Sequence, residues 1–272
     1  MKKLVLTILL LSLGLLSACG AAEQHLRVDF YDVGKADAIL ITLPNGQRIL
    51  IDAATNDEGK DLVKRFKKEG IASIDLMIIT HFDKDHVGGA DKIVEDLAVA
   101  SVLMPVYDKD SKQYTQFIEA LQKSGSTQVT HMETGKEMAF EAGGASFTVT
   151  SAHRACYGTD EENDFSLVMR MTYGDTKFLF AGDAEEARQL EILEEGSVDC
   201  DVLKTPYHGR LTDASAAFIA AASPKIAFVT DSDDEPASEM VLAMLEEAGA
   251  QVYSARNGDL TVVSDGKDVR TL

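Results

Sequence analysis

One stretch of the chain, 80–89 (THFDKDHVGG), concentrates the side chains that could carry chemistry. It follows the apolar run 76–79, whose pattern is typical of a strand buried on both faces. Two imidazoles and two carboxylates then occur close together, and both groups are common ligands of divalent metal ions. They are His81, Asp83, Asp85 and His86. Because the glycines at 88 and 89 let the backbone pass close to a site, the stretch predicts a metal site at the end of a buried strand.

The elements around this stretch predict an α/β chain. Strands are expected at 26–33, 38–43 and 48–51, and Asn45-Gly46 between the last two is a strong hairpin signal. The pattern is again β-rich from 129 to 180, and helical stripes of apolar residues lie between the strands. Two β-rich halves with intervening helices predict two sheets packed face to face with helices outside.

The charge of the chain limits its possible partners. Lys and Arg number 26 against 45 Asp and Glu, which gives a formal charge of −19. A protein that coats duplex DNA needs many cationic contacts to phosphates, so we expect no strong duplex-DNA binding. The acidic runs 160–162 and 231–235 would repel a long polyanion if they lie beside the site. Three cysteines are too few for a disulfide framework, and Cys156 and Cys200 could either pair or stay unpaired.

The N-terminus has the features of a secretory signal peptide. Two lysines precede an apolar run over 4–16, and Leu-Ser-Ala-Cys at 16–19 resembles the lipobox of bacterial lipoproteins. That resemblance implies cleavage before Cys19 and lipidation of its sulfur; a plain secretory signal is the alternative. The mature chain would carry 24 Lys and Arg against 45 Asp and Glu, a charge of −21. We predict an extracytoplasmic, membrane-anchored lipoprotein with a signal peptide at 1–19, a short tether at 20–25 and a single domain at 26–272.

The pattern His-x-Asp-x-Asp-His-x-Gly-Gly at 81–89 resembles the signature of metallo-β-lactamase-fold hydrolases, in the variant with Asp at the third position. Further segments are similar to other motifs of that family: 32–37 (DVGKAD), 49–52 (ILID), 163–168 (NDFSLV), 178–183 (FLFAGD) and 203–209 (LKTPYHG). Together they look most like the hydrolase domain of the ComEC competence proteins and its stand-alone relatives. The resemblance implies an αββα sandwich, with two mixed β-sheets face to face and helices outside.

The resemblance also implies two divalent metal ions. The first would be held by His81 and Asp83, the second by Asp85, His86 and His208, and Asp183 would bridge them. A ligand set without thiolates admits Mn²⁺ as well as Zn²⁺. The third ligand of the first ion stays open among His153, Asn163 and Asp164. Asp183 could also cap the helix that follows it. The residues expected to support and orient the ligands are Asp37, Asp52, Asn163 and Tyr207.

Some positions near the last motif depart from the family pattern. Tyr207 and Arg210 stand where relatives usually have a second His and a Ser, and Glu235 stands where many have His. In the expected mechanism, Asp85 orients or deprotonates the attacking water. Lys204, Tyr207 and Arg210 would contact the phosphate or protonate the leaving group.

These observations predict an extracytoplasmic dinuclear-metal hydrolase, a phosphodiesterase or nuclease that uses a metal-bound hydroxide. The oxygen-rich ligand set and the ComEC-like segments favour phosphodiesters as substrates. Two alternatives stay open, because one fold hosts many functions. One is hydrolysis of a lactone, thioester or β-lactam on the same fold. The other is a catalytically degenerate lipoprotein that binds at the cell surface.

Overall fold

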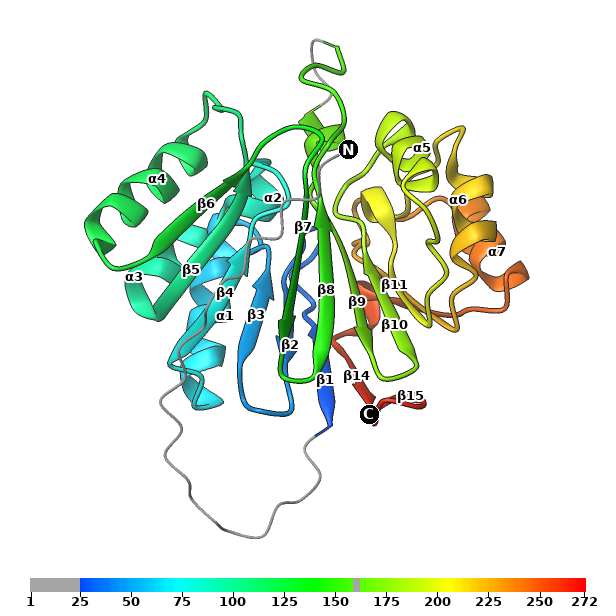
Figure 1. Cartoon of the computed structure of the whole chain (residues 1–272), viewed down its shortest axis with the longest axis horizontal. Helices are drawn as coiled ribbons and strands as arrows, with labels where there is room; N and C mark the ends of the chain where they lie inside the picture. Colours follow the sequence, from blue (N-terminus) through cyan, green and yellow to red (C-terminus); the bar gives the residue numbers. More distant parts are fainter. Residues whose placement is uncertain (1–24, 159–161) are drawn as a thin grey trace, which may run out of the picture.

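The computed structural model describes residues 25–158 and 162–272, which form two mixed β-sheets face to face with helices on both outer faces (Figure 1). One sheet has the strand order β15 (Val269–Thr271), β14 (Leu260–Ser264), β1 (Leu26–Phe30), β2 (Ile39–Thr42), β3 (Arg48–Ile51), β4 (Ser73–Ile78), β5 (Ala98–Pro105) and β6 (Gln128–Met132). The other has the order β13 (Gln251–Ser254), β12 (Ile226–Val229), β11 (Val202–Lys204), β10 (Thr176–Phe180), β9 (Val168–Tyr173), β8 (Ala145–Thr150) and β7 (Glu137–Ala142). The expected αββα arrangement is confirmed.

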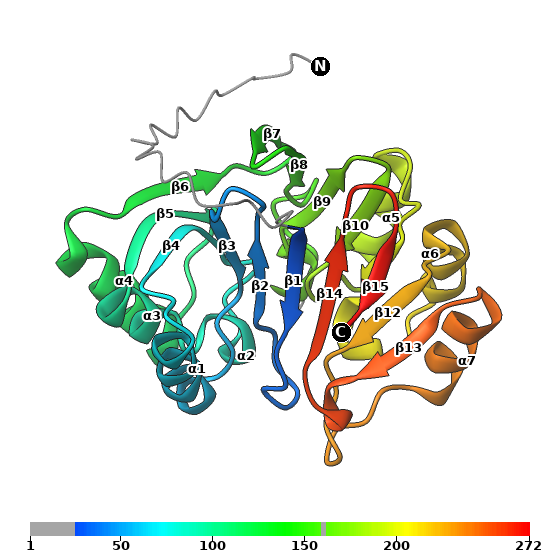
Figure 2. The same cartoon turned by 90° about the horizontal axis from the view of Figure 1, so that it is seen from below.

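Helices cover the two outer faces in separate groups (Figures 1 and 2). The first sheet carries α1 (Asn56–Lys68), α2 (Lys84–Val87), α3 (Ala90–Asp96) and α4 (Lys112–Ser124). The second carries α5 (Glu186–Glu194), α6 (Ser215–Ala222) and α7 (Glu239–Glu247). Within the described ranges, none of these helices has the length and apolar character needed to cross a membrane. The predicted signal peptide, its Cys19 and the tether up to residue 24 lie outside the described residues.

The strand directions bring several strand ends to one edge of the sandwich. In the first sheet, β2 and β3 are antiparallel and are joined through the predicted Asn45-Gly46 turn, where Gly46 has a φ of 87°. From β3 to β6 the strands run parallel, as do β10 to β13 in the second sheet. Ligand sites form beyond the carboxyl ends of parallel strands. The loops after β3, β4, β10, β11 and β12 are therefore placed to build one.

Apolar side chains fill the space between the sheets and under both groups of helices. Phe30 and Phe228 meet between the sheets, with ring centroids 4.9 Å apart. Along β4, Leu76 and Ile78 join this central core, whereas Met77 packs toward the helices. The predicted burial of this run on both faces is confirmed. Each such side chain contributes about 1.5–3 kcal/mol to the free energy of unfolding when it is fully buried. This burial fixes β4 and, with it, the start of the loop that follows.

The two cysteines outside the predicted signal peptide are both free. Cys156 is exposed, whereas Cys200 is buried under the helices of the second sheet. Burial raises the pKa of the Cys200 thiol, so this side chain stays protonated and behaves as a small apolar group.

Two backbones touch where the loop after β4 turns into α3. A Cβ atom on Gly89 would lie 2.3 Å from the Ala53 carbonyl oxygen and 2.5 Å from the Cα of Gly59 on α1. A Cβ atom on Gly88 would also lie 2.8 Å from the Thr55 carbonyl carbon. Real Cβ atoms do not approach this closely, so the two glycines permit the close passage that the sequence predicts, and they fix the loop that carries the histidines.

We expect Gly89→Ala to destabilise the fold more than an alanine at an unhindered glycine. A methyl group at Gly89 forces the loop and α1 apart, so the free energy of unfolding should fall by about 3 kcal/mol. The control is Gly125→Ala at the end of α4, where φ is 61° but nothing lies within 4 Å of the added atom; the strain there should cost about 1 kcal/mol. Urea denaturation of both variants checks this, and equal losses would contradict the proposed clamp.

Candidate metal centre

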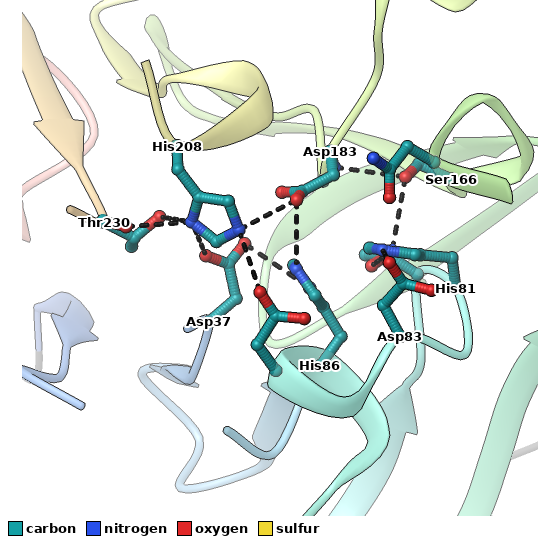
Figure 3. Close-up of polar contacts among 12 residues, drawn as sticks. Asp37, His81, Asp83, His86, Ser166, Asp183, His208 and Thr230 are labelled. Atoms are coloured by element: carbon teal, nitrogen blue, oxygen red, sulfur yellow. Dashed lines mark hydrogen bonds and ion pairs between the residues drawn. The ribbon is translucent and has the colours of Figure 1, made fainter. Parts of the chain in front are cut away.

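Residues that follow five strand ends meet between the two sheets (Figure 3). Asp52 follows β3 and the loop 79–89 follows β4, while Asp183, His208 and Thr230 follow β10, β11 and β12. Four buried side chains bring ligand atoms within 4.8 Å of one another. They are Asp37, His86, Asp183 and His208. The site thus joins both sheets at the edge where their parallel strands end.

His86 is held by a buried carboxylate on one side and faces the centre on the other. Its Nδ1 lies 2.8 Å from Asp52 Oδ2, and Asp52 also accepts hydrogen bonds from the Thr80 amide (2.8 Å) and hydroxyl (2.7 Å). This bonding assigns a proton to Nδ1 and aims Nε2 at Asp183 Oδ2, 3.3 Å away. Burial disfavours the imidazolium, yet the carboxylates, Asp183 foremost, raise the pKa of His86 well above its usual value. The centre therefore attracts positive charge to this place.

His208 comes from a strained turn after β11. Tyr207 and His208 have φ values of 51° and 52°, in the left-handed region that residues with a Cβ rarely adopt. The turn is held because His208 Nδ1 donates to the Thr230 carbonyl oxygen at 2.8 Å. Its Nε2 lies 2.8 Å from Asp183 Oδ2 and 3.5 Å from Asp85 Oδ2. The left-handed turn thus directs His208 Nε2 toward the carboxylates of Asp183 and Asp85.

His81 and Asp83 lie beside this group. The His81 ring is 4.1 Å from the His86 ring, and its Nδ1 is 3.1 Å from the Thr80 hydroxyl. Its Nε2 lies 3.9 Å from Asp83 Oδ2, while Lys109 contacts the other carboxylate oxygen of Asp83. Burial and the neighbouring His86 lower the pKa of His81 to about 4. His81 is therefore neutral at pH 7 and offers a nitrogen lone pair.

The surroundings of the Nε2 atoms of His81, His86 and His208 indicate whether a metal ion fits the centre. Each is buried and makes no hydrogen bond of acceptable geometry within the described part of the chain. Buried polar atoms are normally satisfied, and an imidazole nitrogen that faces a carboxylate must share a cation with it, either a proton or a metal ion that displaces the proton. Neutral imidazoles and carboxylates are ligands that divalent transition metals accept. The donor set therefore fits a divalent metal ion.

Asp37 and Lys204 support the centre from behind. Lys204 is fully buried, and its Nζ lies 2.6 Å from Asp37 Oδ2, 2.9 Å from the Gly182 carbonyl oxygen and 3.3 Å from Asp183 Oδ1. Asp37 faces the Nδ1 sides of two histidines, at 3.8 Å from each, and not their free Nε2 atoms. We expected Lys204 to contact the phosphate or the leaving group. That expectation is wrong, because its ammonium is inaccessible and already paired with both carboxylates.

Asp85 lies at the edge of the centre and pairs with a lysine that the sequence analysis did not single out. Lys35 Nζ lies 2.6 Å from Asp85 Oδ2. Although burial opposes ionisation, the neighbouring His208, His86 and Lys35 lower the pKa of Asp85, which keeps it a carboxylate. Lys35 belongs to the segment 32–37, which is similar to a motif of the family. That similarity predicts that the segment lies near the centre, but it does not predict that Lys35 pairs with Asp85.

Tyr207 and Arg210 lie together where the chain leaves the centre. The Arg210 guanidinium stands over the Tyr207 ring at 5.4 Å and forms an ion pair of 2.6 Å with Glu235. Both side chains keep contact with solvent. The acidic run 231–235 therefore places one carboxylate next to the last predicted motif.

The three candidates for a third ligand of the first ion all have other partners. His153 is exposed, and its Nε2 lies 3.1 Å from Glu195. Asn163 donates its amide nitrogen to Glu185 at 2.6 Å, while its Oδ1 is buried and has no hydrogen-bond partner within the described ranges. Asp164 accepts from the Glu185 and Arg188 amides and so caps α5, which resolves the alternative that Asp183 is the cap. Asp183 is left to face the histidines.

The comparisons with known proteins agree with this geometry. A family model described as the metallo-beta-lactamase superfamily matches residues 31–229. The chain is 27% identical over 209 residues to "Recombination protein 2" of Haemophilus influenzae and 24% identical over 221 residues to "ComE operon protein 3" of Bacillus subtilis. Each match covers 75% of this chain but only 24% and 28% of those proteins. The chain thus spans about a quarter of the length of these relatives.

A similar solved structure is Igni18, described as a novel metallo hydrolase from the archaeon Ignicoccus hospitalis. It has a TM-score of 0.55 and 17% identity, and the match covers 91% of this chain and 98% of that one. At this identity the likeness shows the fold alone, but the family match extends over most of the chain. The chain therefore belongs to the metallo-beta-lactamase superfamily, with ComEC-like sequence relatives.

Proposed function

We propose that this protein is a metal-dependent phosphodiesterase. The observation that carries the proposal is the buried group of free imidazole nitrogens aimed at Asp183, with Asp85 beside it. A set of neutral imidazoles and ionised carboxylates without thiolate suits Mn²⁺ or Zn²⁺. The site thus has the ligands to hold a metal ion and one carboxylate close enough to act on a water.

Cationic side chains around the centre favour an anionic substrate. Lys35 pairs with Asp85 and Lys109 with Asp83, and Arg210 follows His208 by two residues. Each of these cations is paired with a carboxylate, Arg210 with Glu235, so a bound metal ion would supply the excess positive charge. Lactones and β-lactams carry no negative charge at the reacting carbonyl, whereas a phosphodiester does. With a metal ion bound, the charge of the centre would favour phosphodiesters over the alternative substrates.

Each residue of the centre has a distinct part in this chemistry. A divalent ion, when bound, supplies Lewis acidity toward a phosphoryl oxygen and lowers the pKa of a coordinated water. His86, His208 and Asp183 would hold it, with the imidazoles kept in orientation by Asp52 and Thr230. Asp85 would orient the attacking water by accepting a hydrogen bond from it. Lys35 would neutralise charge that develops on the phosphate.

The proposal includes an extracytoplasmic, lipid-anchored location. It rests on the charged start, the apolar run 4–16 and the Leu-Ser-Ala-Cys ending at 16–19. Because the described domain begins at residue 25, only a few residues would separate the lipid from the enzyme. Substrates near the outer face of the membrane would then reach the centre first.

Asp85→Asn tests the role of the carboxylate at the water. The substitution keeps the size of the side chain but removes its basicity, so kcat/KM toward bis(p-nitrophenyl) phosphate in Mn²⁺ or Zn²⁺ should fall at least about 100-fold. Thermal melting should show a folded protein. The matched control is Asp61→Asn on the exposed face of α1, where Asp61 pairs with Lys64 and activity should not change. An Asp85→Asn enzyme with near-normal turnover would remove Asp85 from the mechanism.

The size of the substrate is tested by salt dependence. A mature chain with a charge near −21 lacks a track of cations, so a small diester should be cleaved while duplex DNA binds weakly and with a shallow salt slope. Binding of a fluorescent duplex is measured by anisotropy between about 50 and 200 mM salt. A loss of affinity of about a thousandfold or more over this range would reveal several phosphate contacts and make a nuclease the better assignment.

Cys19→Ala tests the proposed anchor. Without the sulfur no lipid can be attached, so metabolic labelling with a fatty acid should fail and processing of the N-terminus should be impaired. Fractionation of a bacterial host then gives the measurement, with Cys156→Ala as the control that keeps its lipid. A Cys19→Ala protein that stays in the membrane fraction and matures normally would contradict the lipoprotein proposal.

A further inference from the structure

We propose that this protein holds one divalent metal ion tightly, and that the Lys109 ammonium takes the place of a second ion beside Asp83. This inference departs from the two ions that the family resemblance implies. The number of bound ions can be measured without a substrate, so this proposal is tested separately from phosphodiester hydrolysis.

Lys109 lies in the connection between β5 and α4 and reaches across to the loop after β4. Its Nζ contacts Asp83 Oδ1 and Glu162 Oε2, and both contacts are close. The Lys109 side chain is only 20% exposed, which is low for a lysine on a connecting segment. One ammonium thus already joins two carboxylates, one of which is the Asp83 carboxylate expected to hold the first ion.

The ligands on this side are weaker than those on the other side. His81 Nε2 is free, but Asp83 shares its charge with Lys109. Zn²⁺ takes four ligands in structural sites and at least three protein ligands in catalytic ones. Of the third-ligand candidates, His153 is bonded to Glu195 and Asp164 caps the start of α5. Asn163 donates its amide nitrogen to Glu185 and keeps a buried Oδ1 without a partner among the described residues, but a neutral amide oxygen is not among the usual ligands of Zn²⁺. An ion placed here would also be repelled by the ammonium.

The other side of the centre has what this side lacks. His86 and His208 each have Nδ1 bonded to an orienting acceptor and Nε2 free. Both Nε2 atoms lie within 3.3 Å of Asp183 Oδ2, and Asp85 Oδ2 is 3.5 Å from His208 Nε2. Three protein side chains can therefore converge on a single ion, with Asp85 at its edge and without Asp83 or His81.

The test counts the ions bound to the full protein after equilibrium dialysis against Mn²⁺ or Zn²⁺, by native mass spectrometry and elemental analysis. Wild type should hold one ion, and the Mn²⁺ form should give the electron paramagnetic resonance spectrum of an isolated ion. His81→Ala should keep that ion, whereas His208→Ala should weaken its binding by about 100-fold or more. Two tightly bound, magnetically coupled ions in wild type, or the loss of one ion in His81→Ala, would overturn the proposal.

Lys109→Met tests the part played by the ammonium. The variant keeps the length of the side chain but frees Asp83 and Glu162, so a second ion should bind at least about tenfold more tightly than any second ion in wild type. Lys112→Met, at the exposed start of α4, is the matched control and should bind one ion. If Lys109→Met folds and gains no second ion, the proposal that Lys109 takes the place of an ion is wrong. If the variant fails to fold, the number of ions bound to wild type and to His81→Ala still tests the one-ion proposal. A one-ion protein without diesterase activity would contradict only the proposed function.

Discussion

The structure depends on negative charge that is buried between the two sheets. Asp37, Asp52 and Asp183 are each at most 2% exposed. Buried carboxylates are costly unless hydrogen bonds and opposite charges satisfy them. Thr80 and His86 satisfy Asp52, and Lys204 pairs with Asp37. Asp183 has a weaker share of the same ammonium and faces two imidazole nitrogens, so a cation at that point, either a proton on an imidazole or a metal ion, satisfies it.

The rest of the fold places the groups that meet this requirement. The parallel strands of the two sheets end at one edge, so residues distant in the chain converge there. Asp52 and His208 hold left-handed φ values of 57° and 52° that only a rigid surrounding sustains. The contact of Gly89 with Gly59 then fixes the loop that carries His86. Strain and close packing are thus concentrated where ligand positions must be exact to a few tenths of an ångström.

Much of the fold and part of the centre could be predicted from local patterns. The buried strand followed by His and Asp predicted the loop after β4, and Asn45-Gly46 predicted the hairpin. Both predictions were possible because each pattern is contained in a few consecutive residues. The burial of Lys204 could not be predicted from the sequence. A lysine next to a motif is equally consistent with a solvent-exposed charge, and only the folded structure shows that Lys204 is buried. The pairing of Lys35 with Asp85 and of Lys109 with Asp83 likewise joins segments that only the folded chain brings together.

Metal-dependent stability measures most directly whether a divalent cation completes this buried centre. The free energy of unfolding is determined in chelator and in increasing Mn²⁺ or Zn²⁺. An ion that binds the folded chain alone should raise it by about 2.7 kcal/mol when its concentration is about 100 times Kd. The increase should vanish in His208→Ala. Equal stability with and without metal, over concentrations up to the millimolar range, would contradict the account.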